Sequence, residues 1–192
     1  MSEIADSTSR LILILGGARA GKSSFALNLA ADRELSSECD VCFVATAQAL
    51  DEDMAMRIAR HRSDRPSHWR TIEEPYHLDE ALRESETAGI VIVDCLTLLV
   101  SNWLLRDEPE CEQKLNEIAE TLISAAKSHN QLLICVSNEV GLGLVPDTQL
   151  GRRYRDVLGR VNQQFAQAAD EVYLLVAGLP LRLKPQRTSR AL

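Results

Sequence analysis

Short apolar runs alternate along this chain with longer stretches in which apolar residues recur every three or four positions. The short runs predict strands that are buried on both faces. They are Leu11–Leu15, Val41–Ala45, Ile90–Val93, Leu132–Val136 and Val172–Ala177. The longer stretches predict helices over Lys22–Ala31, Glu52–Arg62, Leu78–Arg83, Cys111–Ser128 and Gln149–Ala169. Because strands that alternate with helices favour parallel pairing, the pattern predicts an α/β fold, a three-layer sandwich with helices on both faces of a mostly parallel sheet.

The remaining segments complete this picture. Trp69–Glu73 reads as a short edge strand, and the C-terminal region reads as a hairpin with a turn at Gly178-Leu179-Pro180 and a return strand over Leu181–Lys184. A length of 192 residues suits one domain. We therefore expect a single domain over 10–184, a disordered polar leader over 1–9 and a mobile polar tail over 185–192.

Composition and charge restrict the class of partner. The formal net charge is −7, which argues against general electrostatic binding to nucleic acid or to anionic membranes. No apolar stretch approaches the roughly 20 residues that cross a bilayer, and the leader lacks a signal-peptide pattern. Five cysteines fit reduced thiols better than a disulfide framework. These features predict a cytoplasmic protein with no membrane span and no nucleic-acid partner.

The first apolar run ends in a glycine-rich turn that a lysine and a serine follow. Glycines let backbone N–H groups point inward around a phosphate, and the helix that begins near Lys22 aims its free N–H groups at the anion. Lys22 is expected to reach the β- and γ-phosphates, and the Ser23 hydroxyl to bind Mg²⁺. The turn fits the P-loop pattern G-x-x-x-x-G-K-[ST] over Gly16, Gly17, Ala18, Arg19, Ala20, Gly21, Lys22 and Ser23.

A carboxylate ends the third apolar run, because Asp94 follows Ile90–Val93 directly. An acidic residue at the end of a buried strand is the usual second part of a P-loop site, and Asp94 is expected to hold Mg²⁺ directly or through water. The alternative is that Asp94 caps the helix after it. Together with the P-loop, this pattern predicts binding of a nucleoside triphosphate, but it does not separate a small-molecule kinase, a motor and a switch.

A basic cluster surrounds one histidine in this otherwise acidic chain. Helical spacing places Met54, Ile58 and His61 on one stripe of the second predicted helix. One reading is a solvated basic helix with His61 packed at its inner edge. The other is a second polyphosphate clamp, because arginine pairs bidentately with phosphate and a neutral imidazole can attack phosphorus to form a phosphoramidate. The four arginines of the cluster are Arg57, Arg60, Arg62 and Arg65.

Two further polar positions follow predicted strands. Asn138 and Glu139 come directly after Leu132–Val136 in a glycine-rich segment. Ligands of open α/β sheets bind beyond the carboxyl ends of the strands, so these residues are expected at the same edge as the P-loop. An ordinary connecting loop is the alternative.

Together these residues resemble one family from about Leu11 to Lys184, the bifunctional adenosylcobinamide kinase / adenosylcobinamide-phosphate guanylyltransferase of cobalamin biosynthesis. The P-loop itself is shared by many proteins. The specific part of the resemblance is the combination of M-x-x-R-I-x-x-H-R-x-x-R-P-x-x-W-x-T-x-E, over Met54 to Glu73, with SNEVGLGLVP, over Ser137 to Pro146. This resemblance implies a RecA-like P-loop core and a homotrimer.

The resemblance also implies two reactions and a set of site residues. The kinase phosphorylates adenosylcobinamide with ATP or GTP. The guanylyltransferase attaches the GMP of GTP to a histidine, releases pyrophosphate, and passes the GMP to adenosylcobinamide phosphate to give adenosylcobinamide-GDP. His61 matches that histidine, and Lys22 is the second implied catalytic residue. The implied nucleotide contacts are Gly16 to Ser23, Ala45, Thr46, Ala47, Arg62, Ser63, Asp64, Arg65, Glu73 and Asp94.

Two other functions fit the P-loop alone. A monofunctional kinase of another small molecule would have no need of a histidine ringed by arginines. A nucleotide-driven switch would bind a macromolecular partner, for which the sequence offers neither a basic stripe nor an exposed aromatic set.

Overall fold

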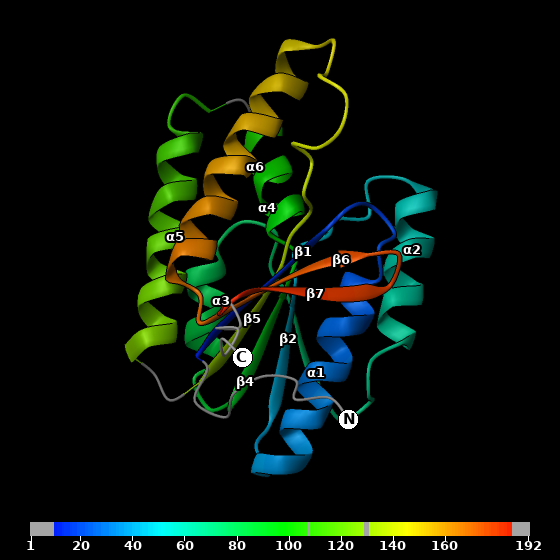
Figure 1. The fold of residues 1–192 in the computed structure, drawn as a ribbon, viewed down its shortest axis with the longest axis vertical. Helices are drawn as coiled ribbons and strands as arrows, with labels where there is room; N and C mark the ends of the chain where they lie inside the picture. The colour runs from blue at the N-terminus through cyan, green and yellow to red at the C-terminus, as the bar shows by residue number, and fades with distance from the viewer. Residues whose placement is uncertain (1–9, 107, 129–130, 186–192) are drawn as a thin grey trace, which may run out of the picture.

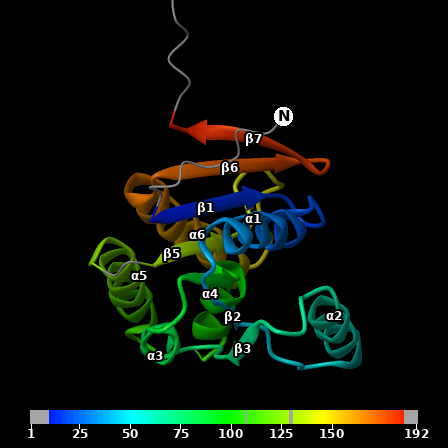
Figure 2. The ribbon, with the colours of Figure 1, turned by 90° about the horizontal axis from the view of Figure 1, so that it is seen from below.

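Seven strands form one sheet in the computed structural model, which describes residues 10–106, 108–128 and 131–185. Their order across the sheet is β3-β2-β4-β5-β1-β6-β7 (Figure 2). The strands are β1 (Leu11–Gly16), β2 (Val41–Ala45), β3 (Arg70–Glu73), β4 (Ile90–Asp94), β5 (Leu132–Val136), β6 (Glu171–Val176) and β7 (Leu179–Lys184). The expectations for 1–9 and for 186–192 lie outside the described residues.

Helices cover both faces of this sheet, as the alternating pattern predicts. They are α1 (Lys22–Ser37), α2 (Glu52–Ser63), α3 (Leu78–Glu84), α4 (Leu96–Leu105), α5 (Cys111–Ser128) and α6 (Gln149–Ala168). Figure 1 shows α1 and α2 on one side of the sheet and α3 to α6 on the other. Alternate residues of β1 serve the two cores: Ile12 and Ile14 belong to the core under α1, and Leu11 and Leu13 to the core under the other helices. The α/β three-layer prediction is confirmed.

The sheet topology brings the expected ligand-binding positions to one edge. All strands except β7 pair in parallel. Asp94 at the end of β4 is in register with Val136 of β5, which is in register with Ile14 of β1. The carboxylate and the P-loop therefore lie at the same edge with only β5 between them, which is where open parallel sheets bind ligands.

The C-terminal hairpin is confirmed, but its predicted turn is wrong. Val176 pairs with Leu179, so the two-residue turn is Ala177-Gly178 rather than Gly178-Leu179-Pro180. Ala177 and Gly178 have φ of 51° and 83°. Positive φ at both central residues is the geometry of the hairpin turn that follows the right-handed twist of strands.

One helix, α4, is absent from the helical patterns found in the sequence, and α1 runs six residues further than predicted. Seven of the ten residues of α4 are buried. The helix packs between β5 on one side and α5 and α6 on the other. A helix surrounded in this way carries no polar stripe, so hydrophobic periodicity does not distinguish it from a buried strand.

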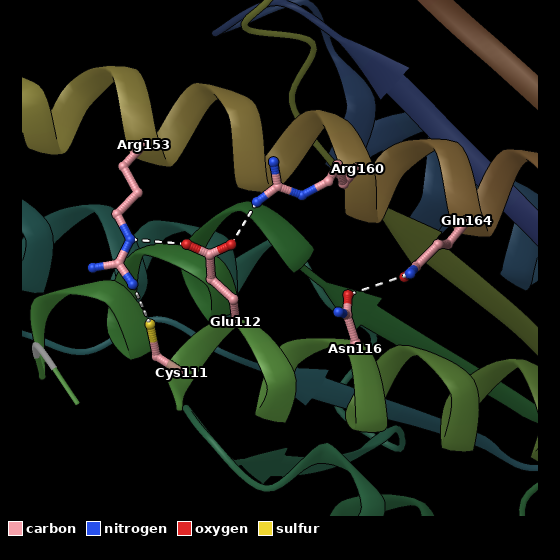
Figure 3. Close-up of polar contacts among 6 residues, drawn as sticks. All are labelled: Cys111, Glu112, Asn116, Arg153, Arg160 and Gln164. Carbon is pink, nitrogen blue, oxygen red and sulfur yellow. Dashed lines mark hydrogen bonds and ion pairs between the residues drawn. The ribbon is translucent and has the colours of Figure 1, made fainter. Parts of the chain in front are cut away.

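Polar contacts tie α5 to α6 on the outer face of the fold (Figure 3). The Glu112 carboxylate of α5 accepts hydrogen bonds from Arg153 at 2.9 Å and Arg160 at 2.6 Å. Arg153 also donates to Cys111 Sγ at 3.2 Å. Arg153 and Arg160 of α6 therefore pair within the molecule rather than contribute to a free basic face.

Candidate functional site: a triphosphate cavity between the P-loop and a basic helix

The P-loop joins β1 to α1 with an open helix terminus. Gly21 is the N-cap of α1 with φ 92° and ψ 12°, and no side chain caps the helix there. The first-turn N–H groups are consequently left for an anion. Lys22 is 8% exposed, and its Nζ donates to the Gly17 carbonyl oxygen at 2.7 Å. Burial lowers the pKa of Lys22, while the nearby Cys95 and Asp94 oppose that change.

Gly16 is required at the start of the loop because a neighbouring strand passes close to it. A Cβ at Gly16 would lie 2.7 Å from the Leu175 carbonyl oxygen of β6, whereas one at Gly17 would meet nothing within 4 Å. We predict that Gly16→Ala lowers the free energy of unfolding by about 1–3 kcal/mol, the usual cost of overpacking. Gly17→Ala, the matched control, is expected to change it by no more than about 0.5 kcal/mol. Urea unfolding measures both, and equal effects would contradict this account of the loop.

Two adjoining cavities open beside the P-loop. The larger has a volume of about 860 Å³ and the smaller about 150 Å³. Both are bounded by the P-loop and by α2, which stand on the same side of the sheet in Figure 1. Residues that line both cavities are Lys22, Ser23, Met54, Arg57, His61, Arg65 and Asp94.

His61 faces these cavities rather than a packed core. No residue of α2 is buried. Met54, Ile58 and His61 are its half-buried residues, and all three line the smaller cavity. The helical stripe expected from their spacing is thus confirmed. The reading of His61 as a packed residue is wrong, because the stripe covers a cavity instead of a hydrophobic core.

The smaller cavity is locally basic although the chain is acidic. Its lining carries four cationic side chains, Lys22, Arg57, Arg62 and Arg65, against the two carboxylates Glu73 and Asp94. Such a lining attracts a polyphosphate despite the net charge of −7.

Two arginines of the basic cluster are held by neighbouring strands. Arg62 pairs with Glu73 of β3 at 3.7 Å. The Arg65 guanidinium lies over the Phe43 ring at 3.7 Å, and its Nε is a buried donor without a partner in the described part of the chain. Burial lowers the pKa of Arg65, and Asp94 opposes this shift. A half-buried guanidinium whose Nε donor is unused beside a cavity is suited to receive an anionic oxygen.

The structure brings most of the expected nucleotide contacts together. Around the cavities lie Arg19, Ala20, Gly21, Lys22, Ser23, Ala45, Ala47, His61, Arg62, Asp64, Arg65, Glu73 and Asp94. Outside their lining lie Gly16, Gly17, Ala18, Thr46 and Ser63. Gly16, Gly17 and Ala18 shape the start of the loop, and the Ser63 hydroxyl donates to the Arg60 carbonyl within α2.

Thr46 has a structural position instead of a place on the cavity wall. Its side chain is fully buried, and its Oγ1 donates to the Cys95 carbonyl oxygen and accepts from the Cys95 N–H, both at 2.8 Å. Asn102 of α4 donates to the Thr46 carbonyl oxygen at 2.9 Å. The end of β2 is therefore fixed to the turn that carries Asp94.

Ser23 and Asp94 fit a magnesium ion. Both line both cavities, and both offer hard oxygen ligands. Mg²⁺ in nucleotide sites is held by one or two such side chains together with phosphate oxygens and water. The N-cap of α4 is Cys95, so the alternative role of Asp94 as the cap of that helix is wrong.

Several lining residues are not among the nucleotide contacts that the resemblance implies. They include Phe43, Met54, Arg57, Thr97 and Asn138. Asn138 does lie at the expected edge, and its carbonyl oxygen and N–H are held by Asn162 and Thr97. Helical spacing signals Met54 and Arg57, whereas Phe43 and Thr97 occupy ordinary positions in apolar runs that carry no functional signal.

A P-loop after β1 that faces an acidic strand end across a parallel sheet defines the class of P-loop nucleotide-binding proteins. In agreement, one solved structure of an ATPase domain superposes with a TM-score of 0.51 at 20% identity, covering 86% of this chain and 69% of that one. This likeness supports the fold. No helix in the described ranges is long and apolar enough to cross a membrane.

The particular family follows from the comparison of sequences. Residues 12–183 match the family model of cobinamide kinase / cobinamide phosphate guanyltransferase. The bifunctional adenosylcobalamin biosynthesis protein CobP of Pseudomonas aeruginosa is 48% identical over 90% of this chain and 96% of its own. The corresponding CobU of Escherichia coli is 42% identical over 91% and 99%. This chain belongs to the cobinamide kinase / cobinamide phosphate guanyltransferase family, as the resemblance in its sequence implies.

Proposed function

We propose that this protein phosphorylates adenosylcobinamide with ATP or GTP and then converts adenosylcobinamide phosphate to adenosylcobinamide-GDP with the GMP of GTP. The observation that carries the proposal is that His61 lines the same two cavities as Lys22, Ser23 and Asp94. One bound triphosphate is then within reach of both a P-loop and a nucleophile. A monofunctional kinase would not need this arrangement, and the relatives that the chain matches are bifunctional by name.

In the kinase reaction the chain acts by position and charge. Loop N–H groups and Lys22 hold the β- and γ-phosphates. The substrate hydroxyl attacks the γ-phosphorus and loses its proton to solvent, the bond from the γ-phosphorus to the bridging oxygen breaks, and the nucleoside diphosphate leaves. Phosphoryl transfer depends chiefly on alignment and on neutralising charge at the transferring group. When bound at Ser23 and Asp94, Mg²⁺ supplies further neutralisation of the phosphate oxygens.

In the guanylyl reaction His61 acts as the nucleophile. A ring nitrogen of the uncharged imidazole attacks the α-phosphorus of GTP, and GMP becomes bound to His61 as a phosphoramidate. The phosphate of adenosylcobinamide phosphate then displaces the imidazole. Arg62 and Arg65 lie beside His61 and offer charge for the phosphate oxygens, and Glu73 is suited to accept hydrogen bonds from a ribose or base.

Two finer features of the proposal rest on the family resemblance. We propose a homotrimeric assembly, which the resemblance implies, and a cytoplasmic location, which is in keeping with relatives that are named as biosynthesis proteins. Sedimentation of the purified protein tests the assembly.

Incubating the protein with adenosylcobinamide, GTP and Mg²⁺ tests the two reactions together. Mass analysis of the products is expected to find adenosylcobinamide phosphate first and adenosylcobinamide-GDP later. Accumulation of the phosphate with no GDP derivative would overturn the bifunctional proposal.

A further inference from the structure

We infer that Arg57 is a further catalytic residue of guanylyl transfer, which binds the pyrophosphate that leaves when His61 attacks GTP. The inference rests on the proposed function. Arg57 lies four residues before His61 on α2, so the two side chains share one face of the helix one turn apart. Both line the larger and the smaller cavity.

Arg57 differs from the other arginines of the basic cluster in what it contacts. Arg62 is paired with Glu73, and Arg65 is stacked on Phe43. Arg60 lines only the larger cavity. Among the four, only Arg57 lines both cavities with a side chain that makes no hydrogen bond or ion pair to the described residues. Its donors are therefore available to a ligand.

A second cation stands close to Arg57 on the P-loop side. Lys22 of the P-loop lines the same two cavities as Arg57 of α2. Like charges that face a shared cavity repel each other, and an anion bound between them offsets this repulsion because it attracts both. The pair thus favours a polyphosphate held by Lys22 from the loop and by Arg57 from α2, with the α-phosphorus turned toward His61.

The chemistry of the step gives this position a role. A lone pair of the His61 ring forms the new N–P bond, and the bond from the α-phosphorus to the bridging oxygen breaks. The electron pair of that bond goes to the oxygen, which leaves as part of pyrophosphate, while the proton on the other ring nitrogen passes to solvent. A guanidinium that neutralises the developing charge on this oxygen speeds the attack. No pyrophosphate leaves when GMP moves on to the acceptor.

The two half-reactions therefore separate Arg57 from residues that merely support the fold. We predict that Arg57→Gln slows formation of guanylylated protein from GTP on the order of 10²-fold. The variant should also weaken the binding of pyrophosphate in the reverse reaction, which regenerates GTP. Transfer of GMP from the labelled protein to adenosylcobinamide phosphate is expected to slow far less. Inorganic pyrophosphatase added with GTP drives the variant to the labelled state for this second measurement. Arg57→Lys should recover part of the first rate.

The matched control is Arg83→Gln, which removes an exposed arginine of α3 on the other side of the sheet and should leave both half-reactions unchanged. Equal slowing of both half-reactions by Arg57→Gln, or of neither, would overturn the inference while leaving the proposed function intact. Failure of the unsubstituted protein to take up GMP at all would overturn the proposed function and the inference with it.

Discussion

Replacing His61 with alanine is expected to abolish covalent GMP and to reduce guanylyl transfer by roughly 10⁴-fold or more, because loss of a nucleophile removes the route through the covalent intermediate. Phosphorylation of adenosylcobinamide should continue, since the P-loop and the magnesium ligands are untouched. The fold should also be preserved, because no residue of α2 is buried. Labelling with α-³²P GTP and a separate kinase assay measure the two effects.

The matched control for this variant is His68→Ala. His68 lies shortly after the end of α2, where its Nε2 is 2.8 Å from Glu34 Oε1, and it lines neither cavity. We expect normal covalent labelling of His68→Ala and no covalent labelling of His61→Ala. Covalent labelling of His61→Ala would show that another residue is the nucleophile.

Replacing Lys22 with alanine is expected to lower both activities by about 10²–10³-fold, the usual effect of removing one charge-stabilising donor. Lys22 is buried, donates to the Gly17 carbonyl oxygen and lines both cavities, so one side chain serves whichever reaction the bound triphosphate undergoes. This outcome distinguishes a shared site from two separate ones. Steady-state assays of the kinase and of guanylyl transfer measure it.

Lys114→Ala is the control for loss of a lysine, because Lys114 pairs with Glu117 on the surface of α5. It should leave both activities unchanged. Undiminished guanylyl transfer by Lys22→Ala would contradict a triphosphate site shared by the two reactions.

The parts of the site that are encoded locally could be predicted from the sequence. The P-loop is one continuous segment, and Asp94 ends a recognisable buried strand, so the parallel sheet alone brings them to one edge. The stripe of Met54, Ile58 and His61 follows from the helical repeat in the same way. Local patterns of this kind do not depend on how distant segments pack.

The parts that depend on packing could not be predicted. The family resemblance implies that Thr46 contacts the nucleotide. Its hydroxyl instead bonds to the backbone of Cys95, because β2 and β4 are neighbours in the sheet. Nothing in the run that contains Phe43 shows that its ring supports Arg65. The α4 helix is surrounded by other elements, which removes the polar face that would have identified it.

The central claim is that one triphosphate cavity presents the α-phosphorus of GTP to His61. Peptide mapping of the unsubstituted protein after incubation with α-³²P GTP and Mg²⁺ tests it most directly. The account predicts a single labelled peptide with GMP on His61, released by acid and stable to alkali as a phosphoramidate should be. A label on another residue, or no label under conditions in which adenosylcobinamide-GDP is formed, would contradict it.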